Sequence, residues 1–133
     1  DGLVSELDSK MQVCGLGFAA GLERLVGVMQ DRGLFPELPR EGAYVAAMGP
    51  NAVPVANKLA SELRMLGLRA ETDLMSRSVK AQMKYADKTN SRFAVVIGDS
   101  EVESGRVTVK DMAGGEPFEV SLDQAAETMA ERT

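Results

Sequence analysis

Histidine and tryptophan are absent from this chain of 133 residues, and cysteine occurs only once, as Cys14. Without histidine the chain lacks the commonest general base and a frequent metal ligand, so we expect no metal site. One cysteine cannot form an intrachain disulfide, which fits a reducing compartment such as the cytoplasm. Cys14 lies in an apolar run, and no histidine is present to activate it, so we interpret it as a packing residue rather than a nucleophile.

Aromatic residues and long hydrophobic runs are also scarce. Aromatics make up 5% of the chain, which leaves few platforms on which single-stranded bases could stack. The uncharged run of residues 11–22 is interrupted by glycines, so the sequence predicts neither a signal peptide nor a membrane span. Hydrophobic residues at 44% and charged residues at 26% are ordinary values for a globular domain.

Positive charge is concentrated in one segment of an otherwise acidic chain. The formal net charge is −5, yet residues 77–110 carry +3 and residues 111–133 carry −5. Five cations fall within sixteen residues: Arg77, Lys80, Lys84, Lys88 and Arg92. The three lysines are four residues apart, so on a helix they form a single row. Such a row favours a surface that binds a polyanion, although by itself it also fits an ordinary solvated helix face.

The order of apolar patterns and breakers predicts the elements of an α/β fold. Residues 10–19 read as a strand, and residues 20–32 read as an amphipathic helix that ends at Gly33. Residues 34–42 contain two prolines and read as a linker. The later elements are strands at 43–49, 68–73 and 92–99, helices beginning near Asn51 and Ser78, a hairpin of 106–112 and 117–122, and a closing helix capped by Ser121 and Gln124.

These elements predict two domains, residues 1–40 and residues 41–133. Because crossovers between parallel strands are right-handed, the second domain should contain a mixed, mostly parallel five-stranded sheet flanked by helices. Arg77 and Glu101 then both follow the carboxyl end of a strand, where open α/β sheets bind ligands. Lys110 alternates outward along its strand. A carboxylate that can accept from a base, beside cations that seek phosphate, suits a reader of an RNA loop. The ordinary alternatives are a turn residue for Glu101 and an exposed strand lysine for Lys110.

The N-terminal residues carry a second motif. The run "DGLVSEL" followed by "GFAAGLERL" resembles the end of the catalytic domain of histidyl-tRNA synthetases, whose class II motif 3 has a strand, a glycine-rich turn and an arginine. By this resemblance the arginine is Arg24, which would grip the ATP phosphates in an intact enzyme. The rest of the chain, from about Ala43, resembles the anticodon-binding domain shared by the histidine, threonine, proline and glycine enzymes.

The resemblance implies that the chain reads the anticodon of histidine tRNA. Arg77, Glu101 and Lys110 would contact the anticodon, and Lys80, Gln82 and Lys84 would support the RNA backbone. The first two class II motifs would lie upstream of Asp1, so the chain by itself should be inactive and need no cofactor. The parent would use ATP and magnesium.

The resemblance also predicts how the protein associates, and the sequence leaves two alternative functions open. The parent enzyme would be a homodimer, and residues 12–32 would lack their partners and could mediate self-association. One alternative is a regulatory paralogue, the regulatory subunit of ATP phosphoribosyltransferase, which shares the catalytic fold. Another is a small-molecule-binding α/β domain that uses the turns at Gly49 and Gly98.

Overall fold

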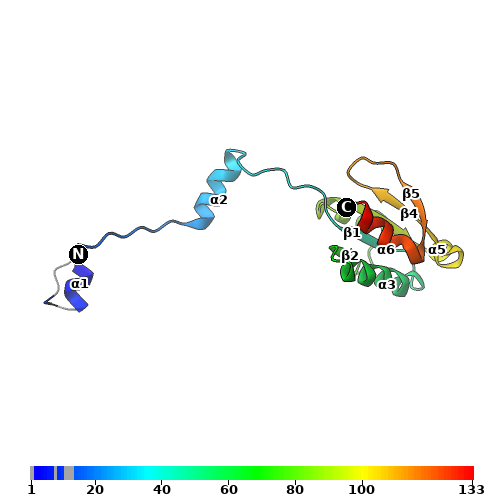
Figure 1. The fold of residues 1–133 in the computed structure, drawn as a ribbon, viewed down its shortest axis with the longest axis horizontal. Helices are drawn as coiled ribbons and strands as arrows, with labels where there is room; N and C mark the ends of the chain where they lie inside the picture. The colour runs from blue at the N-terminus through cyan, green and yellow to red at the C-terminus, as the bar shows by residue number, and fades with distance from the viewer. Residues whose placement is uncertain (1, 8, 11–13) are drawn as a thin grey trace. The chain divides into compact units, whose positions relative to one another are not determined.

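A computed structural model describes residues 2–7, 9–10 and 14–133 and divides the chain into two units between Glu37 and Leu38 (Figure 1). The first unit contains the helices α1 (Gly2–Leu7) and α2 (Leu22–Asp31). No side chain described in this unit is buried. Helix α2 is followed by Gly33, whose φ of 62° is left-handed, as the sequence predicts for a helix end.

The strand predicted at residues 10–19 is wrong over the residues that can be checked. Residues 14–21 adopt no regular structure, and residue 10 lies in a turn. Residues 11–13 lie outside the described part of the chain. A strand exists only when a neighbouring strand accepts its backbone hydrogen bonds. None of the five strands of the sheet in the described chain pairs with residues 14–21, so the alternating pattern alone does not produce a strand.

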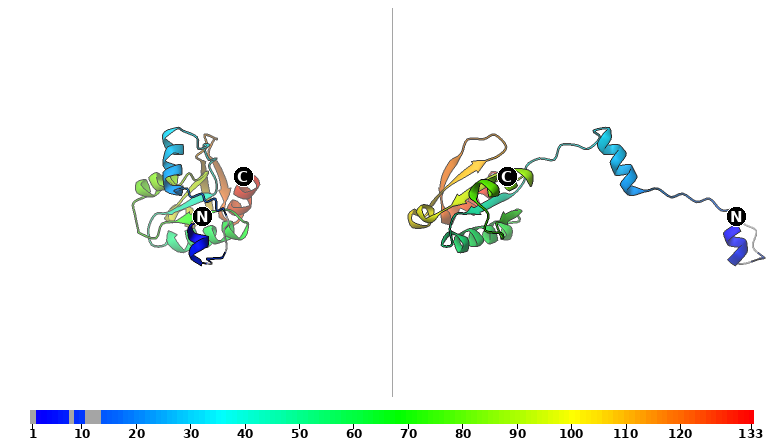
Figure 2. Two further views of the ribbon diagram at one scale, coloured as in Figure 1. Left: turned by 90° about the vertical axis from the view of Figure 1, so that its left-hand side faces the viewer. Right: turned by 180° about the vertical axis from the view of Figure 1, so that it is seen from behind.

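The second unit is built on five strands: β1 (Ala43–Ala47), β2 (Ala70–Thr72), β3 (Phe93–Ile97), β4 (Arg106–Asp111) and β5 (Phe118–Ser121). Their order in the sheet is β2-β1-β3-β4-β5. Strand β1 pairs in parallel with β2 and β3, whereas the β3–β4 and β4–β5 pairings are antiparallel. Four of these strands therefore run in one direction and β4 runs in the other. The mixed, mostly parallel sheet is confirmed, with the β4–β5 hairpin at one edge (Figure 1, Figure 2).

Helices cover the two faces of the sheet unequally. Helices α3 (Ala52–Met65) and α6 (Leu122–Glu131) contact each other and the same face (Figure 1). There they enclose the larger core, which includes Val45 and Val95. Helix α4 (Val79–Lys88) packs on the opposite face, over Tyr44 and Ala46 of β1. Because side chains alternate along a strand, neighbouring residues of β1 supply the two cores.

Two predicted helix caps are wrong, and one short helix of the second unit escapes prediction, as α1 does in the first unit. Asn51 makes no capping bond; its Nδ2 instead donates to Oδ1 of Asp99 at 3.3 Å. The Ser121 hydroxyl donates to the Gln124 side chain at 3.3 Å rather than accepting from a backbone N–H. By contrast, Ser78 caps α4 by accepting from the N–H of Ala81 at 3.4 Å. The missed helix is α5 (Asp99–Ser104), where the sequence suggests only a turn.

Gly42 explains how β1 can start directly beside β2. Its φ of 70° is left-handed, and the neighbouring Ala43 N–H donates to the Arg69 carbonyl at 2.8 Å. A Cβ at this position would collide with that carbonyl oxygen. Glycine is therefore required both by conformation and by space. No helix in the described part of the chain is long and apolar enough to cross a membrane.

Candidate nucleic-acid interface

Arg77 lies at the end of the loop that joins β2 to α4, and Asp73 holds it there. The Asp73 carboxylate accepts from the Arg77 backbone N–H at 2.6 Å and from the Arg77 Nε at 2.5 Å. The Asp73 side chain is 3% exposed, whereas the Arg77 side chain is 33% exposed. The guanidinium is thus fixed through its Nε, and no acceptor in the described chain occupies its terminal nitrogens. This leaves a fork of donors suited to a phosphate or a base edge.

The ring of Tyr85 lies beneath the guanidinium. The Arg77 Cζ is 4.5 Å from the centre of this ring, and Tyr85 meets Tyr44 edge to face at 6.0 Å between centroids. Such a cation–π contact restricts the orientation of the guanidinium plane. Sequence reasoning missed both Tyr85 and Asp73. The signal for Asp73 is its spacing of four residues before Arg77, a rule for helices that here operates in a loop.

The charges of this cluster respond to one another. Burial by itself would raise the pKa of Asp73, but the hydrogen bonds from Arg77 outweigh it and hold that pKa below its ordinary value. The same bond raises the pKa of Arg77. Burial raises the pKa of the Tyr44 hydroxyl, and the Asp73 carboxylate adds to the increase. The nearby Arg77 guanidinium partly offsets this rise in the pKa of Tyr44. The Tyr44 hydroxyl has no geometrically defined hydrogen-bond partner in the described chain.

Gln82 does not belong to the surface, contrary to the prediction that it supports the RNA backbone. It is 1% exposed. Its amide is used by the backbone of Ala47 and by the carbonyl of Arg77. A buried side chain whose donors are already hydrogen-bonded cannot reach a phosphate, so Gln82 does not contact the RNA backbone. Gln82 is two residues from both Lys80 and Lys84, about half a helical turn, so it falls on the buried side of α4, opposite the lysines.

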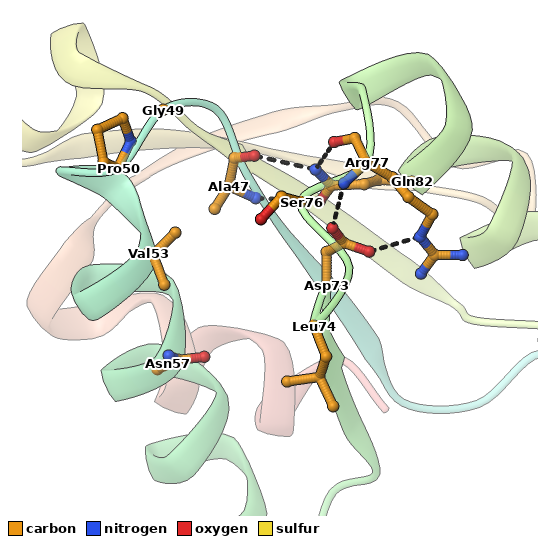
Figure 3. Close-up of a pocket in the computed structure, with 10 residues that line it drawn as sticks. All are labelled: Ala47, Gly49, Pro50, Val53, Asn57, Asp73, Leu74, Ser76, Arg77 and Gln82. Atoms are coloured by element: carbon orange, nitrogen blue, oxygen red, sulfur yellow. Dashed lines mark hydrogen bonds and ion pairs between the residues drawn. The ribbon is translucent and has the colours of Figure 1, made fainter.

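Two hollows adjoin the Arg77 loop. The first, of about 490 Å³, lies between α3 and the loop, with Val53 and Asn57 on one side and Leu74 on the other (Figure 3). Figure 3 shows the Arg77 guanidinium directed away from these α3 residues. The second hollow, of about 720 Å³, contains both Arg77 and Tyr85 in its lining and is named the Arg77 hollow. The guanidinium is therefore presented beside the tyrosine rather than into the first hollow.

Glu101 occupies the first turn of α5 and is partly committed to that helix. Its Oε2 accepts from the Gly98 N–H at 2.8 Å and from the Ser100 hydroxyl at 3.0 Å. The Gly98 bond, followed by the Ser100 bond, lowers the pKa of Glu101. The carboxylate is thereby kept ionised and oriented. Its other oxygen has no acceptor role in the described structure and remains able to accept from a ligand.

Glu101 and Lys110 line one groove of about 340 Å³, named here the Glu101 groove. Lys110 is paired with Ala94 across the β3–β4 ladder, so both point to the α4 face of the sheet. The groove has an apolar part formed by Met48, Met83, Ala94 and Val96, and a polar part formed by Ser100, Glu101, Thr108 and Lys110. A lining that combines apolar side chains with a few polar groups suits a flat, partly polar ligand such as a nucleobase.

The structure brings together two of the three residues predicted to contact the anticodon. Glu101 and Lys110 share the Glu101 groove, whereas Arg77 lines the Arg77 hollow. Met83 lines the groove, and its neighbour Gln82 binds the Arg77 carbonyl. The first turns of α4 therefore separate the two hollows. A ligand that uses all three residues would have to span this helix start.

Lysines form an exposed row along α4. Lys80, Lys84 and Lys88, called the α4 lysine row, are all exposed, and none of them joins an ion pair found in the described chain. Asp87 is the acid of this helix, and it is bound by Arg40 at 2.5 Å. On the opposite face of the sheet α6 carries three acids and no base. A polyanion is therefore favoured on the α4 face and disfavoured on the α6 face.

Arg24 lies in α2, in the first unit. That unit buries none of the side chains described in it, so these residues do not enclose an ATP site by themselves. No group of three histidine, cysteine or acidic side chains in the described residues is arranged to hold a metal ion.

The chain is similar to known proteins over most of its length. It is 48% identical over 124 residues to the histidine–tRNA ligase of Acetivibrio thermocellus, which covers 92% of this chain and 30% of that protein. The crystal structure of apo histidyl-tRNA synthetase from S. aureus matches with 34% identity and a TM-score of 0.68, over 80% of this chain and 32% of that one. The crystal structure of the Nostoc sp. PCC 7120 histidyl-tRNA synthetase matches with 32% identity and a TM-score of 0.69, over 84% and 28%.

The chain spans about 30% of the length of the curated relatives it matches. Residues 42–132 match the family described as the anticodon binding domain. The match contains all five strands of the sheet, the Arg77 loop and the Glu101 groove. On this ground the chain belongs to the anticodon binding domain family.

Proposed function

We propose that residues 38–133 recognise the anticodon of histidine tRNA as part of an ATP-dependent histidine–tRNA ligase. The observation that carries the proposal is the family match over residues 42–132, which contains a cationic surface next to a groove fit for a base. The relatives named as histidine–tRNA ligases support the identity of the tRNA. They also favour this reading over the regulatory paralogue and over a small-molecule domain.

Arg77, Glu101 and Lys110 have different roles in this proposal. Arg77 offers a fixed guanidinium fork in the Arg77 hollow, beside the Tyr85 ring. Glu101 offers an ionised oxygen at the rim of the Glu101 groove, where it can accept from a base amino group or ring N–H. Lys110 stands in the same groove as a mobile cation. Single-stranded loops expose the base edges that such groups read.

The α4 lysine row would supply the sequence-independent part of binding. Its exposed cations, which join no ion pair among the described residues, follow one helix edge, so they can neutralise phosphates without reading bases. Lys80 and Lys84 keep the supporting role suggested by the sequence, and Lys88 extends it. Gln82 is excluded from this surface by its burial.

The remaining parts of the proposal concern the longer enzyme. ATP and magnesium would serve its aminoacylation, with Arg24 binding the ATP phosphates once the rest of that site is present. The 133-residue chain by itself would bind tRNA without charging it. The enzyme would be a cytoplasmic homodimer. Helix α2 buries none of its residues and exposes Leu22 and Leu25, which supports self-association of the chain through the apolar face of this segment.

Binding of an anticodon stem-loop tests the central proposal. We expect the chain to prefer the histidine anticodon loop over a loop of scrambled sequence, and Arg77→Ala or Glu101→Ala to weaken binding by about tenfold or more each. Lys58→Ala is the matched control, because Lys58 lies on α3, on the other face of the sheet. Equal affinity for the two loops would contradict anticodon recognition. An additional loss in Lys58→Ala would contradict the choice of face.

A further inference from the structure

In the described part of the chain, the end of β1 has no neighbouring strand on one side. The parallel pairing of β1 with β2 stops at Val45 and Thr72, whereas its pairing with β3 continues to Ala47 and Ile97. The N–H and C=O groups of Ala47 therefore point beyond the end of β2. Ala47 is partly buried, so its backbone groups need partners, because leaving them unpaired away from water is costly.

The side-chain amide of Gln82 supplies both partners. Its Oε1 accepts from the Ala47 N–H at 3.2 Å, and its Nε2 donates to the Ala47 carbonyl at 3.0 Å. The carboxamide thus pairs with Ala47 as the next peptide group of β2 would have done. Figure 3 shows it between the end of β1 and the Arg77 loop.

The same amide also binds the backbone of Arg77. Its Nε2 donates to the Arg77 carbonyl at 2.7 Å, so both of its N–H groups are committed. Asp73 holds the Arg77 N–H and Nε from the other side. The backbone of Arg77 is consequently clamped at its N–H by Asp73 and at its carbonyl by Gln82, while its guanidinium stays partly exposed.

We propose that Gln82 is a positioning residue for RNA recognition: its buried amide replaces a missing peptide of β2 and thereby fixes Arg77 in the lining of the Arg77 hollow. The inference rests on the proposed function and deepens it, since Gln82 itself touches no RNA. Gln82 also lies in the first turns of α4, three residues before Tyr85. By anchoring this part of the helix to Arg77, it keeps the Tyr85 ring in contact with the Arg77 guanidinium. A residue that only stabilised the fold would leave Arg77 in place whenever the chain is folded.

Two variants separate positioning from folding. Gln82→Met keeps the length and burial of the side chain but removes all three hydrogen bonds. Gln82→Glu keeps an acceptor for the Ala47 N–H but turns a second oxygen towards two carbonyls. Ser91→Ala is the matched control, because Ser91 is equally buried at 1% exposure and its hydroxyl contacts Thr89 at the other end of α4. All are measured well below their melting temperatures, with folding verified by circular dichroism.

The first readout needs no RNA. In NMR spectra the Nε–H signal of Arg77 should be protected from solvent exchange by its bond to Asp73. We expect at least tenfold faster exchange in Gln82→Met and no change in Ser91→Ala. Unchanged protection in a folded Gln82→Met chain would overturn the proposal, even if RNA binding proved to have another basis.

The second readout is a double-mutant cycle on binding of the anticodon stem-loop. We expect Gln82→Met to weaken binding about five- to tenfold when Arg77 is present and to have no effect in the Arg77→Ala background. Equal losses in both backgrounds would overturn the positioning role while leaving anticodon recognition intact. If Arg77→Ala alone bound like the wild type, the proposed function of Arg77 would fail instead, and the exchange experiment would still decide whether Gln82 positions it.

The charge on Gln82→Glu gives a third check. When its carboxyl is protonated it can again donate to one of the two carbonyls, and burial raises the pKa of such a group. We therefore expect the stem-loop affinity of this variant, relative to that of the wild type at the same pH, to increase several-fold as the pH falls from about 8 to about 5. The Asp73 carboxyl is bound to the Arg77 backbone, and its lowered pKa keeps it ionised over this range. An affinity ratio that did not change with pH would count against the proposal.

Discussion

Neutralising the α4 lysine row tests whether this helix follows the RNA backbone. The perturbation is the triple variant Lys80→Gln, Lys84→Gln and Lys88→Gln. Consecutive lysines of the row are separated by about 6 Å along the helix, at 1.5 Å per residue. All three are exposed, and Asp87 is bound to Arg40 and does not neutralise them. The row is therefore expected to offer three independent phosphate contacts.

The magnitude follows from counterion release. Each phosphate contact to a single strand contributes about 0.7 to the slope of log K against log salt concentration, so losing three should reduce the slope by about 2. At about 0.1 M salt, one decade below the 1 M reference, this corresponds to about fivefold per contact and about 100-fold for all three. The variant should fold normally, because exposed substitutions usually change stability by about 0.5 kcal/mol or less.

The assay is fluorescence anisotropy of a labelled anticodon stem-loop titrated at several salt concentrations. Lys58→Gln is the control, since Lys58 is exposed on α3 and lies within 3.8 Å of Glu62. Its slope should match that of the wild type. A triple variant with an unchanged slope would refute phosphate tracking by α4, whatever its affinity. A lower affinity with the same slope would mean that the lysines act on the fold or on the base contacts instead.

Two further substitutions test what holds the fold and the Arg77 loop. Gly42→Ala should lower the free energy of unfolding in urea by about 2–3 kcal/mol, because it combines a left-handed alanine with a collision at the Arg69 carbonyl. Gly105 is also left-handed, but a Cβ there would meet open space. An equal loss of unfolding free energy in Gly105→Ala and Gly42→Ala would therefore refute the collision at Gly42. Asp73→Asn should destabilise the chain at pH 7. The pKa of Asp73 is lowered from 3.8, so its contribution is complete above that value and is lost as the pH falls through the folded-state pKa. The difference in unfolding free energy between the wild type and Asp73→Asn, measured as a function of pH, should become smaller below about pH 4. A difference that stayed constant would exclude the bond to Arg77 as its source.

Much of the second unit could be predicted from local pattern. Continuous apolar runs identified β1 and β3, and glycines with left-handed φ marked the ends of α2 and α3 at Gly33 and Gly67. These signals are strong because they depend on the residue's own conformation or on a long periodic stretch. Helix α5 was missed because six residues with three acids contain no apolar periodicity. Its start is stabilised by Glu101, which binds the Gly98 N–H.

The candidate site was predictable only in part. Arg77, Glu101 and Lys110 were found because each follows or lies on a strand that the pattern identifies. Their distribution between two hollows was not predictable, since it depends on where the start of α4 packs. Helical spacing alone indicates that Gln82 faces away from Lys80 and Lys84, since it is two residues from each. Its hydrogen-bond partner Ala47 was not predictable, because it depends on how α4 packs against β1.

By itself the sequence determined the chemistry available to this protein and the main elements of its second unit: the absence of histidine, the single cysteine, the positive segment at residues 77–110 and the order of the five strands. These properties follow from composition and short-range periodicity, which need no partner in space. Only the tertiary structure decided which groups are exposed and which are committed. Asp73 and Gln82 became supports of Arg77 because a missing strand neighbour at Ala47 and a buried carboxylate required partners, and long-range packing placed Arg77 and α4 within their reach.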